Sequence, residues 1–191
     1  MAEVAEIRWH GRAGQGAKSA AYTLAESAGQ EGKYIQAFPV YGSERAGAPM
    51  MAFTRIAEKT IRRHEQIHNP DIVVVLDETI IESGGALKGL KPGGIFMLNT
   101  QASPAEVKAK WAPDMDIKVY TMDATTISLE EMGRPFPNIP MLGALARVAG
   151  LVSLEQLIKD VAETFRKKLG DKVAEANKRS LQRGYEEVQG L

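Results

Sequence analysis

The sequence predicts an α/β protein with an open, mostly parallel sheet flanked by helices, followed by a helical C-terminal extension. Two continuous apolar runs carry this prediction, "DIVVVLDE" at 71–78 and "GGIFMLNT" at 93–100, each preceded by a turn that contains proline. Such runs are typical of strands buried on both faces, and segments with helical spacing alternate with them. With 191 residues, of which 44% are hydrophobic, the chain is long enough to close one core.

The first part of the chain, residues 6–38, predicts a strand, a glycine loop, a helix and a second strand. Its apolar residues first alternate and then take up a helical spacing at Ala20, Ala21, Leu24, Ala25 and Ala28. An insertion at 43–68 interrupts the alternation of strands and helices. Within it, the alternation of residues 50–56 indicates an antiparallel ribbon.

A later helix is predicted at 103–111, where Ser103 and Pro104 suit the N-cap and the first turn. A strand should follow at 116–124. From about residue 138 onward the pattern is helical, with Gly150 and Gly170 as natural helix ends and Ser153 as an N-cap. We therefore expect a single domain, made of an α/β core at 1–150 and C-terminal helices at 151–191.

The composition excludes several classes of function. Lysine plus arginine and aspartate plus glutamate each number 24, so the formal charge is zero and nothing calls for a polyanionic partner such as nucleic acid. The chain has no cysteine, which excludes disulfides and thiolate-ligated zinc or iron-sulfur clusters. The sequence shows neither a secretory signal nor an apolar run long enough to span a bilayer, so we expect a cytoplasmic protein without a membrane partner.

His64, Glu65 and His68 have the H-E-x-x-H spacing of zinc peptidases, in which one helix carries both histidines. Asn69-Pro70 follows immediately and disfavours a helix that extends through His68. We interpret the spacing as polar residues in a loop before a strand. A stand-alone zinc peptidase remains as an alternative.

The loop "GRAGQGAKS" at 11–19 is a better candidate site, because amides at the start of a helix favour an anion. Its glycines do not follow the dinucleotide pattern G-x-G-x-x-G, and Ala17 separates Gly16 from Lys18, unlike in a P-loop. The loop therefore binds a phosphate or carboxylate, packs against a partner chain, or only allows a tight turn. A stand-alone nucleotide-binding domain remains a second alternative.

Several segments together resemble the gamma subunit of the 2-oxoacid:acceptor oxidoreductases, the pyruvate:ferredoxin oxidoreductase family. They cover nearly the whole chain in order: "RWHGRAGQGAKSAAYTLAESA", "YIQAFPVYGSERAGAPMMAFTRI", "NPDIVVVLDETI", "PNIPMLGALARVAG" and "EANKRSLQRGYE".

The resemblance implies an anaerobic-type enzyme complex that oxidatively decarboxylates a 2-oxoacid and transfers the acyl group to coenzyme A. Thiamine diphosphate with Mg and the 4Fe-4S clusters would lie in the alpha, beta and ferredoxin-like partner subunits, and ferredoxin or NAD would accept the electrons. Pyruvate, branched-chain, aryl and dicarboxylic 2-oxoacids all fit the resemblance. This chain would carry no catalytic residue and no metal site, would be inactive alone, and would assist coenzyme A binding and assembly.

The resemblance also implies three groups of residues for the coenzyme A site. They are the glycine loop, a Y-G-x-E-x-x-G segment that ends at Gly47, and a late N-x-x-M-L-G turn: Gly11, Arg12, Gly14, Gln15 and Gly16; Tyr41, Gly42, Ser43, Glu44 and Arg45; and Asn138. Arg12 is the favoured phosphate ligand because its planar fork suits two parallel hydrogen bonds.

Two positions depart from the family pattern. Ala13 stands where glycine is usual, which would strain the loop if that position needs a positive φ. Ala46 stands where arginine is frequent, which removes one positive charge. Plainer roles also remain open, since Glu44 and Arg45 would suit an interface ion pair, Tyr41 would suit stacking at a subunit interface, and Gly143 would suit close helix packing.

Overall fold

The computed structural model describes residues 4–40, 47–82 and 85–190. Within these ranges the chain forms the following elements in order: β1 (Val4–Arg12), α1 (Ala17–Gln30), β2 (Tyr34–Val40), β3 (Pro49–Ala57), β4 (Ile72–Val75), α2 (Thr79–Glu82), β5 (Gly94–Asn99), α3 (Pro104–Trp111), β6 (Ile117–Met122), α4 (Ala124–Met132), α5 (Asn138–Ala149), α6 (Leu154–Leu169), α7 (Asp171–Glu187) and β7 (Gln189–Gly190).

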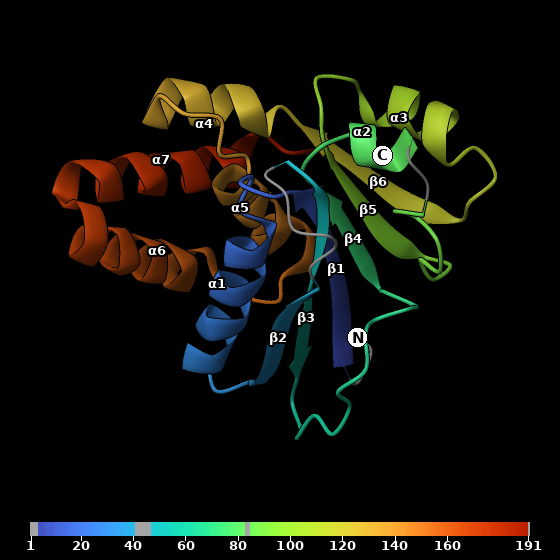
Figure 1. Cartoon of the computed structure of the whole chain (residues 1–191), viewed down its shortest axis with the longest axis horizontal. Coiled ribbons are helices and arrows are strands. Elements are labelled where there is room, and N and C mark those ends of the chain that lie inside the picture. The colour runs from blue at the N-terminus through green and yellow to red at the C-terminus, as the bar shows by residue number, and fades with distance from the viewer. Residues whose placement is uncertain (1–3, 41–46, 83–84, 191) are drawn as a thin grey trace.

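One sheet organises the molecule, with the strand order β2-β3-β1-β4-β5-β6-β7. Strands β1, β4, β5 and β6 pair in parallel, whereas β3 runs antiparallel to both β1 and β2, and β7 runs antiparallel to β6. Helices α1, α4, α5, α6 and α7 lie on one side of the sheet, and α2 and α3 lie on the other (Figure 1). The predicted α/β class, the mostly parallel sheet and the C-terminal helices are confirmed.

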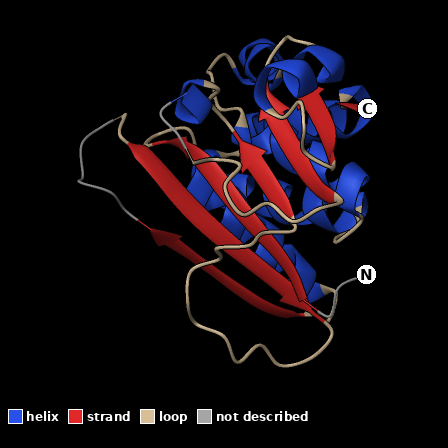
Figure 2. Ribbon diagram, turned by 90° about the vertical axis from the view of Figure 1, so that its right-hand side faces the viewer, coloured by secondary structure: helices blue, strands red, loops and turns tan. Residues whose placement is uncertain are grey.

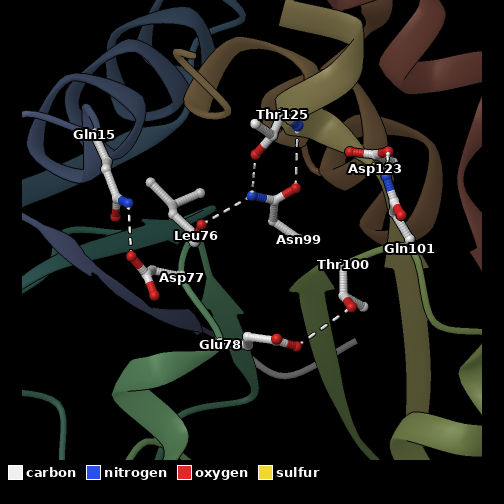
Figure 3. A pocket seen from close by; sticks show the side chains of 9 residues that line it. All are labelled: Gln15, Leu76, Asp77, Glu78, Asn99, Thr100, Gln101, Asp123 and Thr125. Atoms are coloured by element: carbon white, nitrogen blue, oxygen red, sulfur yellow. Dashed lines mark hydrogen bonds between the residues drawn. The ribbon is translucent and has the colours of Figure 1, made fainter.

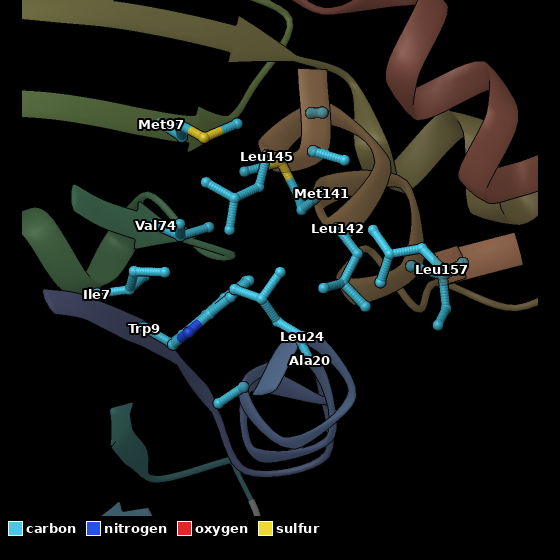
Figure 4. Packing of buried hydrophobic residues seen from close by; sticks show 14 of the residues in the cluster. Ile7, Trp9, Ala20, Leu24, Val74, Met97, Met141, Leu142, Leu145 and Leu157 are labelled. Carbon is cyan, nitrogen blue, oxygen red and sulfur yellow. The ribbon is translucent and has the colours of Figure 1, made fainter. Parts of the chain in front are cut away.

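The main core lies between the sheet and helices α1 and α5 (Figure 4). Trp9 and Leu24 are fully buried there against Leu142 and Leu145. The Trp9 Nε1 donates to Thr54 Oγ1 over 3.1 Å, and the Thr54 hydroxyl donates to the Ala21 carbonyl over 3.0 Å. This chain of hydrogen bonds satisfies the polar atoms that the core encloses and ties β1, β3 and α1 together.

A second, smaller core fills the opposite face of the parallel strands, under α3. Val73 and Val75 point into it, while Val74 and Leu76 point into the main core. Strand β4 is therefore apolar at every position because both of its faces are covered. The described strand, Ile72–Val75, is shorter than the predicted run at 71–78 because Asp77 and the residues after it leave the sheet.

Local signals near helix ends are also confirmed. Ser103 and Glu106 form a reciprocal capping box at the start of α3, and Ser153 caps α6. Gly150 and Gly170 follow the last residues of α5 and α6 as C-caps. The predicted ribbon at 50–56 is the central part of β3.

Helix α7 crosses α5 at two glycines. An added Cβ at Gly143 would lie 1.9 Å from the Leu181 carbonyl oxygen, and one at Gly184 would lie 2.0 Å from the Pro140 carbonyl oxygen. Neither glycine has a positive φ, so the close approach of the two backbones is what requires them. The packing role predicted for Gly143 thus has a geometric basis.

Strand β1 carries polar residues on the face opposite to Trp9. Glu6, Arg8 and His10 are all buried, and the long loop at 58–71, which contains no helix or strand, packs against this side of the strand (Figure 2). Arg8 donates to the carbonyls of Ile67 and His68 in this loop and to the carbonyls of Ala86 and Lys88. A single buried guanidinium thereby fastens two loops to the central strand.

The two other members of this polar layer are also paired. Arg55, 1% exposed, donates from Nε to Glu6 Oε1 over 2.9 Å. His10 Nε2 accepts from Arg8 Nε over 3.0 Å, which places the imidazole proton on Nδ1. Burial, with a further contribution from the charge of Arg8, lowers the pKa of His10 from 6.5 to about 3.

The α5–α7 crossing can be tested by adding one methyl group. We expect Gly184→Ala to destabilise the protein by about 3 kcal/mol, because the new Cβ collides with backbone that has little room to move. Urea unfolding measures this change. Ser180→Ala on the same helix is the control, since the described residues provide no hydrogen-bond partner for the buried Ser180 hydroxyl. Equal stabilities of the wild type and Gly184→Ala would contradict the crossing.

The neutral state of His10 predicts a specific pH dependence. The unfolded chain takes up the imidazole proton near pH 6.5, whereas the folded chain does so only near pH 3, so the free energy of unfolding falls as the pH drops through this window. Between pH 7 and pH 5 the loss attributable to His10 is about 2 kcal/mol. His10→Gln keeps an acceptor for Arg8 and should remove this part of the pH dependence in urea unfolding. His64→Gln, at an exposed site, should leave it unchanged. A His10→Gln variant with the wild-type slope would contradict the assignment.

Candidate functional site

The loops that follow β1, β4, β5 and β6 meet at the carboxyl edge of the sheet. They contribute the glycine loop, Asp77 to Thr79, Asn99 to Gln101, and Asp123 to Thr125. This edge is where open α/β sheets place their ligands, because the strands end there and the following helices begin.

The glycine loop takes the sharp turn that its composition predicts. Gly14 and Gly16 have φ values of 101° and 86°, in the left-handed region. Ala13 is not among the residues with positive φ, so the alanine that replaces the usual glycine is tolerated without strain. The Gln15 amide donates to the Arg12 carbonyl over 3.0 Å, which closes the turn before α1 begins at Ala17.

Asn138 packs directly against this loop from the start of α5. A Cβ added at Gly16 would lie 2.5 Å from Asn138 Cγ, so the carboxamide occupies the space that the glycine leaves open. Asn138 is 6% exposed. The structure thus brings together two predicted site residues that are far apart in the sequence.

Arg12 extends from the end of β1 toward the turn after β4. Its Nη2 and Nε donate to Thr79 Oγ1 over 2.6 and 3.2 Å, and its Nη1 donates to the Gly47 carbonyl over 3.1 Å. Asp77 Oδ2 lies 3.3 Å from the Arg12 Nε. The side chain of Arg12 is 35% exposed, and these contacts occupy one hydrogen on each of the three guanidinium nitrogens, so the group is oriented and remains accessible to an anion.

Asp77 is the centre of this arrangement. Its Oδ2 accepts from Gln15 Nε2 over 2.8 Å, and its Oδ1 accepts from the hydroxyl and amide of Thr79. Burial raises the pKa of Asp77, but the hydrogen bonds from Thr79 and Gln15 and the charge of Arg12 outweigh it, and the pKa lies below its usual value. Gln15 in turn accepts from the Arg12 amide over 2.7 Å, so one ionised carboxylate holds both predicted ligands of the glycine loop.

A polar pocket of about 390 Å³ opens beside Gln15 and Asp77 (Figure 3). Asn99 forms its floor, donating to the Leu76 carbonyl and the Thr125 hydroxyl over 2.9 and 2.8 Å. Glu78 and Asp123 add two carboxylates to its wall. The pocket is suited to a ligand rich in hydroxyl or amino groups, whereas the N-terminus of α1 and the Arg12 guanidinium form the part suited to an anion.

The predicted residues fall into two groups in the structure. Gly11, Arg12, Gly14, Gln15, Gly16 and Asn138 meet at the carboxyl edge. Tyr41, Gly42, Ser43, Glu44, Arg45 and Ala46 lie outside the described residues, although Gly47, the last residue of the same motif, contacts Arg12. Asp77, Thr79 and Asn99 were missed by the sequence analysis, and their positions at the ends of two predicted strands were the signal that marked them.

The histidine motif does not form the geometry that zinc peptidases require. Residues 61–70 contain no helix, and His64 Nδ1 lies 3.2 Å from Gln36 Nε2. Across 4–40, 47–82 and 85–190, no group of three histidine or acidic side chains is placed to hold a metal ion. None of the helices in those ranges is long and apolar enough to cross a membrane.

Comparison with known proteins gives consistent matches along the whole chain. The family model described as pyruvate ferredoxin/flavodoxin oxidoreductase matches residues 6–187. The chain is 52% identical over 183 residues to pyruvate synthase subunit PorC of Thermotoga maritima, which covers 96% of this chain and 94% of that protein. It is 49% identical over 180 residues to the pyruvate/ketoisovalerate oxidoreductases common subunit gamma of Pyrococcus abyssi, with 93% and 96% covered.

The fold is similar to that of a solved relative as well. The crystal structure of pyruvate oxidoreductase subunit PORC from Thermotoga maritima superposes with a TM-score of 0.86 at 48% sequence identity, covering 98% of both chains. The resemblance noted in the sequence is therefore confirmed by sequence and by structure, and this chain belongs to the pyruvate ferredoxin/flavodoxin oxidoreductase family.

Proposed function

We propose that this chain is the gamma subunit of a thiamine diphosphate-dependent 2-oxoacid oxidoreductase, which converts a 2-oxoacid to an acyl-CoA and passes electrons to ferredoxin or NAD. The observation that carries the proposal is the match, over 90% or more of both chains, to relatives named pyruvate synthase subunit PorC and common subunit gamma. Pyruvate is named in both and is the first substrate to test. The Pyrococcus abyssi name adds ketoisovalerate.

The division of labour between subunits that the family resemblance implies agrees with the chemistry of the chain. It has no cysteine and therefore supplies no thiolate to an iron-sulfur cluster. The clusters, the thiamine diphosphate and its Mg belong to alpha, beta and ferredoxin-like partner subunits in this proposal. The role left for the chain is to help hold coenzyme A and to support assembly.

The carboxyl edge of the sheet supports a role in binding coenzyme A. Coenzyme A is a polyanion, and the N-terminus of α1 together with Arg12 offers amides and a fixed positive charge to its phosphates. Asp77 and Thr79 hold the guanidinium in place before the ligand arrives, which reduces the entropy lost on binding. Lys18 does not replace Arg12 in the manner of a P-loop lysine, because its ammonium lies over the Tyr22 ring, 5.7 Å from the centroid.

Arg12→Ala in the assembled complex tests the coenzyme A role. Loss of a charge-assisted hydrogen bond costs roughly 1.5–3 kcal/mol, so we expect the apparent KM for coenzyme A to rise about tenfold or more while the KM for pyruvate stays constant. Steady-state kinetics with a viologen acceptor measures both constants.

Two variants control this experiment. Arg62→Ala removes an exposed arginine from the loop after β3, at the other edge of the sheet, and should change neither constant. Asp77→Asn removes the carboxylate that positions Arg12 and should raise the KM for coenzyme A without changing the KM for pyruvate. An Arg12→Ala complex that assembles poorly but keeps its KM for coenzyme A would assign the loop to assembly instead.

The purified single chain provides a second test. Supplied with pyruvate, coenzyme A, thiamine diphosphate and a viologen acceptor, it should release no carbon dioxide, and adding the partner subunits should restore activity. Full decarboxylation by the isolated polypeptide would overturn the proposed division of labour.

A further inference from the structure

A second pocket lies at the amino edge of the sheet, opposite the edge that carries the glycine loop. It has a volume of about 740 Å³ and is lined by residues from five strands, from the end of α5 and from the turn before β2. The first residues of β4, β5 and β6 contribute Ile72, Gly94 and Ile95, and Lys118, and the last residue of β3 contributes Ala57. None of the residues assigned to the proposed coenzyme A site lines it.

The floor of this pocket is the lower end of the main core. Ile56 and Ile72 are buried, and Ile95, Val148 and Leu151 are partly buried side chains that pack against the same core cluster. Helix α5 ends at Ala149 and Gly150, so no further helical turn covers these side chains. The pocket therefore exposes a concave apolar surface that a hydrocarbon group would remove from water.

Four lysines lie in the lining: Lys33, Lys59, Lys91 and Lys118. Lys33 donates to the Leu151 carbonyl, and Lys91 forms an ion pair with Asp71 over 2.8 Å. The side chain of Lys118 is exposed and makes no hydrogen bond or ion pair with another described residue. The lining also contains Glu58 and Asp71, and just outside it Glu31 and Glu6 each lie 3.8 Å from a lysine, Lys33 and Lys91 respectively. Because Lys33 and Lys91 are paired with carboxylates, Lys118 is the cation that an anion in this pocket can contact.

We propose that this pocket binds a small organic anion that joins a hydrocarbon body to a single carboxylate. The body packs on Ile95, Val148 and Leu151, and the carboxylate pairs with Lys118. The concave shape and the volume are those of a small-molecule site, within the usual range of about 300–1,000 Å³, whereas protein partners need a larger and flatter surface. The site is separate from the proposed coenzyme A site, and its test does not depend on that assignment.

Octanoate is a suitable probe, because it combines eight carbons with one carboxylate. We expect isothermal titration of the full chain with octanoate to show saturable binding to one site. Lys118→Glu should weaken this binding at least tenfold, since it replaces the attraction with repulsion. Octan-1-ol, which has the same chain without the charge, should also bind at least tenfold more weakly than octanoate.

A matched variant separates a specific site from general charge effects. Lys168→Glu makes the same charge change at an exposed position in the last turn of α6 and should leave octanoate binding unchanged. Equal weakening by Lys118→Glu and Lys168→Glu, equal affinity for octan-1-ol, or the absence of saturable binding would each overturn the proposal. Repeating the titration with the assembled complex extends the test. Retained binding supports the small-anion site, whereas complete loss would assign the pocket to a segment of a partner subunit.

Discussion

The structure depends on the burial of strand β1 on both of its faces, with apolar side chains on one face and charged side chains on the other. Ile7 and Trp9 complete the main core, while Glu6, Arg8 and His10 are buried on the other face, where Arg8 bonds to the loop at 58–71. A buried charge is costly unless it is paired, and each of these groups has a partner. Arg55 neutralises Glu6, and Arg8 is surrounded by carbonyl oxygens and one imidazole nitrogen.

The pairing of these buried side chains explains how a segment of about fourteen residues without a helix or strand can pack against the sheet. The loop contributes two buried apolar side chains, Ile67 and Pro70, and its carbonyls serve as acceptors for Arg8 and Arg55. Backbone carbonyls that would otherwise need water are satisfied by guanidinium groups. The same hydrogen bonds fix the first half of β1, the strand that leads into the glycine loop.

The two edges of the sheet differ in chemistry. At the carboxyl edge, an ionised Asp77 fixes Arg12 and Gln15 beside the N-terminus of α1, which suits a polar and anionic ligand. At the amino edge, apolar side chains of the main core are exposed between lysines, which suits an amphipathic ligand. Between the two edges, the backbone amides and carbonyls of β1, β4, β5 and β6 form hydrogen bonds with the neighbouring strands.

The sequence by itself determined the fold class, the buried strands, the helix caps at Ser103 and Ser153, and the glycine loop, because each depends on neighbours within a few residues. It also disfavoured a helix through His64 and His68, since Asn69-Pro70 is a local signal, and the structure has no helix there. Only the tertiary structure decided that Asn138 fills the space above Gly16, that Asp77 orients Arg12, and that Gly143 and Gly184 mark a helix crossing. These contacts join residues from 38 to 122 positions apart. The spacing of residues within one helix or strand does not tell which distant side chain will lie opposite.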